Sequence, residues 1–207
     1  YEYDGDQIRI SVPSRVARGK VEIDYHATPQ RGLYFLAPDE VVKDRPEQVW
    51  SQCQDEDARH WFPCHDKPHV KMTTEMRVRV AEGVSVLSNG DLMDQPHPSY
   101  LMTLVAGRFD VMDDRDAVVG EGRTVPVTYW VPPGRKADAV RAFSETPRMI
   151  ELFSRLTGVP YPWSRYSQVV VSDFIFGGME NTTATTMYEH ILLDERAAID
   201  VVSHDLV

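Results

Sequence analysis

The residues with the clearest chemical potential lie in one short run, Phe176–Asn181 (FGGMEN). Its two adjacent glycines carry no Cβ, so the backbone of a ligand can lie directly against the backbone of the protein. An extended peptide held there by strand addition would meet the carboxylate of Glu180 at the end of the groove. A fixed carboxylate pairs with an ammonium group, so the run predicts a site for the amino end of a peptide. A glycine bulge beside an exposed Glu fits the same letters, because short glycine motifs are weak signals alone.

A second group of candidates lies upstream, where Cys64, His65 and His69 follow Cys53. Two histidines four residues apart match the spacing of metal ligands on a helix. Pro68 lies between them, however, and a strand pattern begins directly after His69, so a helix is not expected to present both side chains. We therefore interpret this Pro-Cys-His-Asp-Lys-Pro loop as structural and expect no metal ligand in it.

The composition limits the class of partner. The chain has 207 residues, with 22 Lys or Arg against 32 Asp or Glu and a net charge of −10 at pH 7. This charge argues against nucleic acid, because a phosphate backbone is bound by a basic surface. It suits a ligand that carries a positive charge, such as a peptide amino terminus. No apolar run approaches the length of a membrane-spanning helix, so no membrane segment is expected in this chain.

The cysteine content bears on the compartment. Two cysteines, Cys53 and Cys64, are too few for a disulfide framework. They are typical of reduced thiols, so we expect a cytoplasmic protein, while one disulfide in a secreted parent stays open as an alternative.

The first two-thirds of the chain shows the alternation of apolar and polar residues that is typical of strands. The longest pattern covers Val70–Val80, and others cover Gln7–Pro13, Val21–Tyr25, Val84–Leu87, Tyr100–Phe109 and Val125–Val131. Such alternation predicts strands with one buried and one wet face. Asn89-Gly90 and Gln95–Pro98 predict turns between them. We therefore expect a mainly β amino-terminal domain of antiparallel sheets over residues 1–132, incomplete at its start.

The pattern changes at Pro132-Pro133-Gly134, which we take as a boundary. Beyond it, apolar residues recur at helical spacing between Thr146-Pro147, a helix start, and Gly158, a helix end. Further elements are expected as a helix over Lys136–Glu145, strands over Tyr166–Val171 and Thr182–Leu193, a short helix or turn over Glu195–Val202, and a new helix capped by Ser203. These elements predict an α+β lobe over residues 133–207.

Several of these segments occur together, in the same order, in one known family. Gly177–Asn181 resembles the exopeptidase signature of the aminopeptidase N family of zinc metallopeptidases, which includes the leukotriene hydrolase relatives. The segments Gln52–Gln54, Asp57–Arg59 and Trp61–Pro68 with Lys71 resemble the upstream block of that family, and Tyr161–Trp163 is also similar. The resemblance runs from about Gln52 to Val207. It implies that residues 133–207 open a thermolysin-like catalytic domain.

The resemblance also implies roles for particular residues. Glu180 would bind the α-ammonium group of a peptide substrate, and Gln54 would help to hold that amino end. The full set of implied substrate-binding residues is Glu180, Gly177, Gly178, Met179, Asn181 and Gln54. Within this set the glycines would offer backbone groups, Met179 would line the pocket for the first side chain, and Asn181 would brace the loop.

The zinc motif of the family, His-Glu-x-x-His, does not occur in the 207 residues. In the family it places two histidines on one helical face with a general base between them, directly after the segment that resembles Asp200–Val207. We therefore expect a fragment that ends just before the zinc ligands and the base. It would contain no catalytic residue, bind no zinc and hydrolyse nothing without the remainder of the catalytic domain.

Two other functions stay open for the parent protein. A non-catalytic relative could keep the fold as an interaction scaffold, although a scaffold has no use for a carboxylate that binds amines. An epoxide hydrolase with peptidase activity, of the leukotriene hydrolase type, would share the same segments. The downstream sequence separates the scaffold from an enzyme, and assays with both substrate classes separate the two enzymes.

Overall fold

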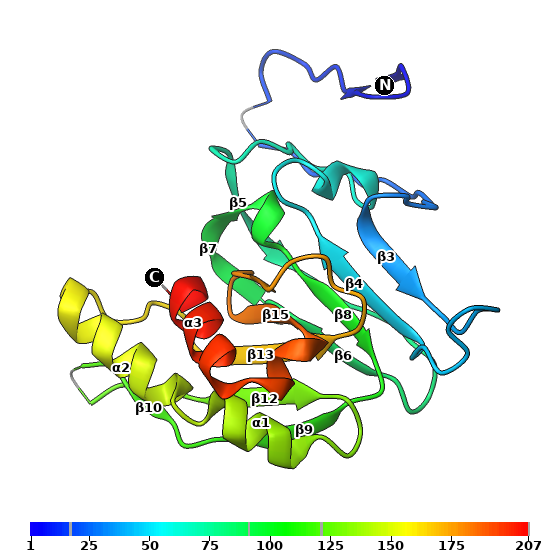
Figure 1. Cartoon of the computed structure of the whole chain (residues 1–207). Helices are drawn as coiled ribbons and strands as arrows, with labels where there is room; N and C mark the ends of the chain where they lie inside the picture. The colour runs from blue at the N-terminus through cyan, green and yellow to red at the C-terminus, as the bar shows by residue number, and fades with distance from the viewer. Residues whose placement is uncertain (17, 91, 121, 207) are drawn as a thin grey trace.

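The structure is a computed structural model that describes residues 1–16, 18–90, 92–120 and 122–206. A short amino-terminal hairpin of β1 (Glu2–Tyr3) and β2 (Ile8–Arg9) lies apart from the body of the protein (Figure 1). The described body contains a four-stranded and a five-stranded sheet, two smaller two-stranded sheets, and helices near the carboxyl end.

The four-stranded sheet is antiparallel throughout and has the order β3-β4-β8-β6. Its strands are β3 (Gly32–Leu36), β4 (Gln48–Gln52), β6 (Ser85–Ser88) and β8 (Leu104–Gly107). A two-stranded antiparallel sheet pairs β5 (Lys71–Glu75) with β7 (Leu92–Pro98), and short 3-10 helices cover Ala58–His60 and Ser99–Leu101. The amino-terminal part is thus mainly β and antiparallel, as the sequence predicts.

The five-stranded sheet has the order β14-β15-β13-β12-β9. Its strands are β9 (Asp110–Asp113), β12 (Val127–Val131), β13 (Tyr166–Val171), β14 (Gly178–Met179) and β15 (Ala184–Tyr188). The central strands β12, β13 and β15 run parallel, while β9 and β14 are antiparallel edges. All six residues of β13 are buried, because the sheet is covered on both faces.

Helices cover one face of this sheet (Figure 1). They are α1 (Lys136–Phe143), α2 (Thr146–Thr157) and α3 (Glu195–Leu206), with a 3-10 helix over Glu189–Leu193 and a two-stranded ribbon of β10 (Ala117–Val118) and β11 (Thr124–Val125) nearby. Pro147 lies in the first turn of α2, and Gly158 ends that helix in the left-handed conformation, at φ 70°. Both helix ends agree with the sequence prediction.

Strand β13 separates two apolar cores. Val170 packs into a core with Phe143 and Ile150 on the helix side. Val169 and Val171, which point the other way, pack with Trp50 and Met179 between the two sheets. The two sheets therefore share one apolar interface, and the segment after β13 is fixed by contacts on both of its sides.

Polar contacts also cross between the sheets at the end of β13. The indole Nε1 of Trp50 donates to the carbonyl oxygen of Ser172 at 3.1 Å, and the backbone N–H of Ser172 donates to Oε1 of Gln48 at 3.0 Å. Both side chains come from β4. They satisfy both backbone groups of the residue that directly follows β13, so the position of the following loop depends on β4.

Several predicted strand limits were wrong. The pattern over Val70–Val80 yields a strand only as far as Glu75, and Val78 and Val80 are each 39% exposed. Within Gln7–Pro13 only β2 forms, and residues 21–25 form no strand, because neither segment packs against a partner sheet. Apolar alternation gives a strand only where a neighbouring strand completes the hydrogen bonds.

Three further predictions, of a turn, a strand and a helix cap, also need correction. Gln95–Pro98, expected as a turn, forms the second half of β7. The strand expected over Thr182–Leu193 is limited to β15, because a 3-10 helix follows it. Ser203 caps no new helix. It lies inside α3, where its hydroxyl donates to the carbonyl oxygen of Asp200 at 3.0 Å.

The boundary predicted near Pro132 falls between β12 and α1. Strands from both sides of that position enter the five-stranded sheet, since β9 and β12 precede it and β13 follows it. The division at residues 132 and 133 stays a prediction. Among the described residues, none of the helices has the length and apolar character needed to cross a bilayer.

The interface between the sheets leads to a stability prediction. Trp50 is 3% exposed, so Trp50→Ala should lower the free energy of unfolding by about 3–5 kcal/mol through lost packing. Trp50→Phe keeps an aromatic ring but leaves the Ser172 carbonyl without its indole donor, which should cost about 1–2 kcal/mol. Urea unfolding measures both. Phe35→Ala, at a side chain 66% exposed on β3, is the control and should change stability by less than about 0.5 kcal/mol.

Candidate functional site

The glycine-rich run lies at an edge of the five-stranded sheet. Gly178 and Met179 form β14, which pairs with β15 through Gly178↔Met187 and Met179↔Thr186, and the N–H of Tyr188 donates to the carbonyl oxygen of Gly177 at 3.1 Å. Since β14 ends the strand order, its second edge has no strand beside it within the described sheet. An extended peptide can add at such an edge by main-chain hydrogen bonds.

Gly178 is required for close packing of α3. A Cβ at this position would lie 2.2 Å from Oδ2 of Asp205 and 2.8 Å from Cγ1 of Val201. The sequence suggested that the glycines leave space for a ligand backbone. The structure instead fills the space beside Gly178 with side chains of α3, so any added peptide must use the free edge of β14 and not this face.

Glu180 occupies the tip of a tight turn. The N–H of Asn181 donates to the carbonyl oxygen of Met179 at 2.9 Å, which closes a three-residue turn around Glu180. Its two neighbours are buried, while Glu180 itself is partly exposed. The turn therefore places this partly exposed acidic residue directly after β14.

The two neighbours of Glu180, Met179 and Asn181, are buried and anchor the turn. Met179 is 1% exposed and packs in the core between the sheets, so its part in a pocket for the first side chain stays a prediction. Asn181 is also buried, and its Nδ2 donates to Oγ1 of Thr186 in β15 at 3.2 Å. This contact ties the turn to the sheet and is compatible with the expected bracing role.

Gln54 lies in an exposed loop that follows β4. The N–H of Asp57 donates to the carbonyl oxygen of Cys53 at 3.0 Å and closes the loop around Gln54. The loop lies directly against Gly32, where a Cβ would be 2.1 Å from the carbonyl oxygen of Asp57. Gly32 also needs its positive φ of 78°, so a side chain there would displace the Gln54 loop.

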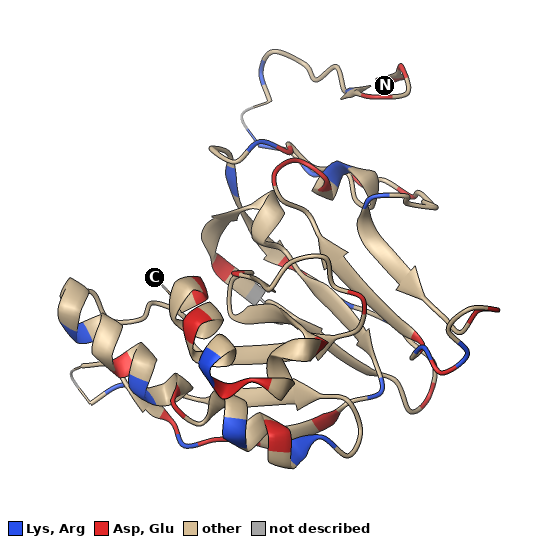
Figure 2. Cartoon of the chain, viewed as in Figure 1, with Lys and Arg blue, Asp and Glu red and all other residues tan. Residues whose placement is uncertain are grey.

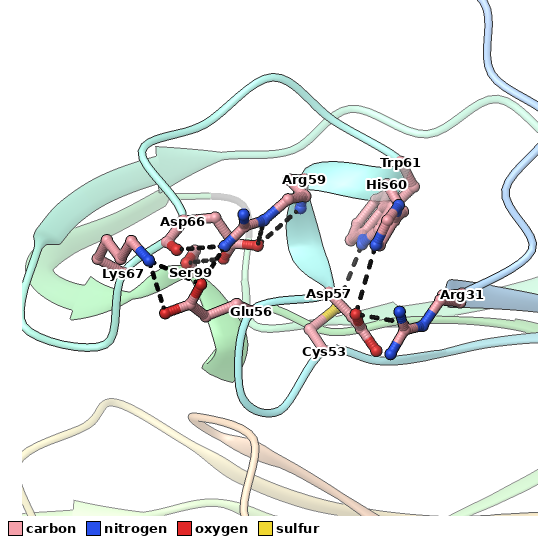
Figure 3. Close-up of polar contacts among 10 residues, drawn as sticks. All are labelled: Arg31, Cys53, Glu56, Asp57, Arg59, His60, Trp61, Asp66, Lys67 and Ser99. Atoms are coloured by element: carbon pink, nitrogen blue, oxygen red, sulfur yellow. Dashed lines mark hydrogen bonds and ion pairs between the residues drawn. The ribbon is translucent and has the colours of Figure 1, made fainter. Parts of the chain in front are cut away.

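An ion-pair network centred on Asp66 supports this loop (Figure 3). The Asp66 side chain is 2% exposed and accepts hydrogen bonds from Nε and the backbone N–H of Arg59, at 3.1 and 3.0 Å. Its other oxygen accepts from Oγ of Ser99 at 2.6 Å. Glu56 pairs with Arg59 and with Lys67. The network joins the Gln54 loop to Ser99, which precedes Tyr100.

Tyr100 connects the two parts of the predicted site. Burial raises the pKa of its hydroxyl, and the carboxylates of Glu180 and Asp55 raise it further. Asp55 follows Gln54 in the chain, so carboxylates of the Gln54 loop and of the Glu180 turn both lie near this hydroxyl. That the side chains of Gln54 and Glu180 face one cleft stays a prediction.

Two polar residues near this region were not among the predicted site residues. Gln52 is 4% exposed, and neither its Nε2 nor its Oε1 has a hydrogen-bond partner among the described residues. The Asp205 side chain is also 4% exposed, and its Oδ2 has no hydrogen-bond partner in the described chain. A Gln in an apolar strand and an Asp on the inner face of a helix are the only sequence signals for them.

The Cys64, His65 and His69 segment does not form a metal site in the described part of the chain, where no group of three potential ligands converges. Cys53 is fully buried, with Nε1 of Trp61 donating to its Sγ at 3.2 Å and Sγ facing the carbonyl oxygen of Gly32 at 3.4 Å. Burial raises the pKa of both thiols to about 12, which opposes the thiolate form that a metal requires. Among the described residues, this segment therefore offers no converging set of ligands for a zinc ion.

Acidic residues continue along α3, which packs against β14 (Figure 2). Within that helix, Asp205 has a pKa raised to about 6, first because it is buried and then because the carboxylate of Glu180 is near. A hydrogen bond with His204 partly opposes this shift. Asp205 and Glu180 together concentrate negative charge beside β14, which favours a cationic group there.

Comparison with known proteins gives two family matches and several relatives. The profile of the peptidase M1 N-terminal domain matches residues 1–99, and that of the peptidase family M1 domain matches residues 141–207. Leukotriene A-4 hydrolase of Xenopus laevis is 29% identical over 100% of this chain and 36% of its own length. Leucine aminopeptidase 2 of Neurospora crassa is 31% identical over 99% of this chain and 32% of its own, and aminopeptidase B of Mus musculus is 30% identical over 91% and 30%. The chain thus spans about a third of the length of these relatives.

The buried carboxyl of Asp205 predicts a pH-dependent stability. Its pKa is about 6 in the folded protein against 3.8 ordinarily. Between these two pH values the carboxyl of the folded protein keeps its proton, while that of the unfolded chain has lost it. Raising the pH through this window therefore lowers the free energy of unfolding. In thermal melts, Asp205→Asn should match the unsubstituted chain near pH 4 and exceed its Tm by about 3–8 °C at pH 7. A Tm difference that is the same at both pH values would contradict this.

Proposed function

Because the chain belongs to the peptidase M1 family, we propose that it is part of a zinc-dependent aminopeptidase and binds the amino end of the peptide substrate. The observation that carries this proposal is the Glu180 turn at the end of an edge strand. A peptide paired with β14 by main-chain hydrogen bonds would direct its α-ammonium toward Glu180. Hydrogen bonds to the backbone of β14 would allow peptides of many sequences to bind, while the Glu180 carboxylate would require a free amino end.

The residues of this chain orient the substrate and do not break the bond. Glu180 fixes the ammonium, and the β14 edge fixes the direction of the peptide, so the first peptide bond lies at a constant distance from the turn. Zinc, when bound to the parent enzyme, would polarise the carbonyl and activate water. We propose that its ligands and the general base belong to the remainder of the parent protein, as the greater length of the relatives suggests.

A second candidate function is epoxide hydrolysis of the leukotriene hydrolase type. It is favoured by the match to a leukotriene A-4 hydrolase over the whole of this chain. In such a parent, Glu180 and Asp205 would serve peptide substrates. The lipid epoxide would be bound by residues outside this chain. Assays of the full-length enzyme with an aminoacyl substrate and with a lipid epoxide distinguish the two activities.

The role of Glu180 is tested by substitution in the full-length enzyme. A hydrogen bond to a charged group contributes about 1.5–3 kcal/mol, so Glu180→Ala should lower kcat/KM on an aminoacyl substrate by about one to two orders of magnitude. Glu82→Ala is the control, because it removes an exposed carboxylate that is distant from Glu180 in the sequence, and it should leave kcat/KM unchanged. Steady-state kinetics measure both variants. A Glu180→Ala enzyme with normal kcat/KM would exclude the role.

The placement of zinc is tested by metal analysis. After dialysis, the full-length parent should hold one zinc per chain, and this 207-residue chain should hold none. Reading the parent gene past the codon for Val207 should also give His-Glu-x-x-His within a few residues. Stoichiometric zinc on the 207-residue chain would instead implicate its own cysteines and histidines.

A further inference from the structure

Asn89 joins the two sheets beside the segment that carries Glu180. It follows β6 and is 3% exposed. Its Nδ2 donates to the carbonyl oxygen of Leu101 at 2.9 Å and to that of Thr182 at 2.6 Å. Its Oδ1 accepts from the N–H of Thr103 at 2.8 Å. Both amide protons and the amide oxygen are thus used, and one of these contacts crosses to the segment that carries Glu180.

The backbone of the two segments is joined at the same place. The N–H of Thr182 donates to the carbonyl oxygen of Leu101 at 3.3 Å, beside the contact from Asn89. Leu101 follows Tyr100, and Thr182 lies two residues after Glu180. Asn89 therefore connects the two backbone segments from which Tyr100 and Glu180 project.

The next residue, Thr183, has a conformation that needs external support. Its φ is 67°, which is rare and strained for a β-branched residue. Its hydroxyl donates to the backbone carbonyl oxygen of Asn89, and its own carbonyl oxygen accepts from the N–H of Ser167 in β13. The strained backbone that turns the chain from Glu180 into β15 is thus held by the same residue, Asn89.

These contacts differ from those of an ordinary hairpin turn. Asn89-Gly90 has the sequence of an exposed turn, yet Asn89 is buried and makes four hydrogen bonds, two of which reach residues more than ninety positions away. The contacts to Leu101 and Thr103 join the end of β6 to the segment before β8, the strand that pairs with β6. The contacts to Thr182 and Thr183 have no role in the β6–β7 connection.

We propose that Asn89 is a positioning residue for recognition of the substrate amino end. It acts through Thr182 and Thr183 on the position and orientation of the Glu180 turn. This inference rests on the proposed function of Glu180. Loss of the Asn89 amide removes its contacts to Leu101, Thr182 and Thr103, so the single backbone hydrogen bond between Thr182 and Leu101 is left to join the two segments. The carboxylate then moves away from the end of the β14 edge, and the enzyme loses its preference for a free amino group.

The experiment compares two ligands that differ only in the amino group. Leucine hydroxamate and 4-methylpentanohydroxamate, its analogue without the amine, are titrated calorimetrically into the full-length zinc enzyme. Asn89→Ala should weaken leucine hydroxamate by about tenfold or more and the analogue by less than about twofold. A role in folding alone would reduce the active fraction and leave both dissociation constants unchanged. Equal weakening of the two ligands, or no change in either, would overturn the proposal.

A milder pair of variants guards against misfolding. Thr183→Val removes only the hydroxyl contact to Asn89 and should show the same selective loss in smaller measure, while Thr183→Ser keeps the donor and should bind as the unsubstituted enzyme does. Ser88→Ala is the matched control. It removes a 2.7 Å hydrogen bond to Thr103 next to Asn89 without a side-chain contact to the Glu180 segment, so it should leave the ligand preference unchanged. A selective loss in Ser88→Ala would overturn the proposal.

The unsubstituted enzyme and Glu180→Ala separate this inference from its premise. If the unsubstituted enzyme binds both hydroxamates equally, the proposed function of Glu180 fails. If it prefers leucine hydroxamate and this preference disappears in Glu180→Ala but persists in Asn89→Ala, the function stands and only the role of Asn89 is refuted.

Discussion

A polar group buried between two sheets costs about 1–3 kcal/mol if it has no hydrogen-bond partner. Several such groups find partners across the interface between the two sheets and so help to fix how the sheets pack. Trp50 and Gln48 bind the backbone of Ser172, and Asn89 binds that of Thr182. These contacts hold both ends of the segment between β13 and β15. The loop that carries the glycines and Glu180 is therefore held at both ends, and between these ends β14 pairs with β15.

Under the proposed function, main-chain pairing along β14 would accept peptides of many sequences, and selectivity for an amino end would depend on the Glu180 carboxylate being held at a constant place. Gly178 contributes by letting α3 pack against the strand, which brings the buried Asp205 near Glu180. The resulting negative charge favours an ammonium group and disfavours the carboxyl end of a peptide. Strain at Thr183 is the cost of turning the chain directly after the carboxylate.

The upstream block is organised around one buried carboxylate, that of Asp66. Asp66 receives hydrogen bonds from Arg59 and Ser99 and so fixes the Gln54 loop against the helical turn that carries Tyr100. The Pro-Cys-His-Asp-Lys-Pro segment, whose cysteine and histidines suggest a metal site at first, contributes its aspartate instead. Its cysteine is a partly buried thiol with a raised pKa.

The sequence by itself determined the family, the antiparallel character of the first part, strand β13, the limits of α2 and the run that contains Glu180. These follow from local patterns: apolar period, helix-end residues and a motif. It did not determine where the strand over Val70–Val80 stops, nor that Asn89 is buried, because a strand needs a partner and an Asn-Gly pair has the same letters in an exposed turn and at an interface. Only the tertiary structure decided that Gly178 serves α3 and that Asn89 reaches Thr182, since contacts between residues far apart in the chain depend on how the two sheets pack.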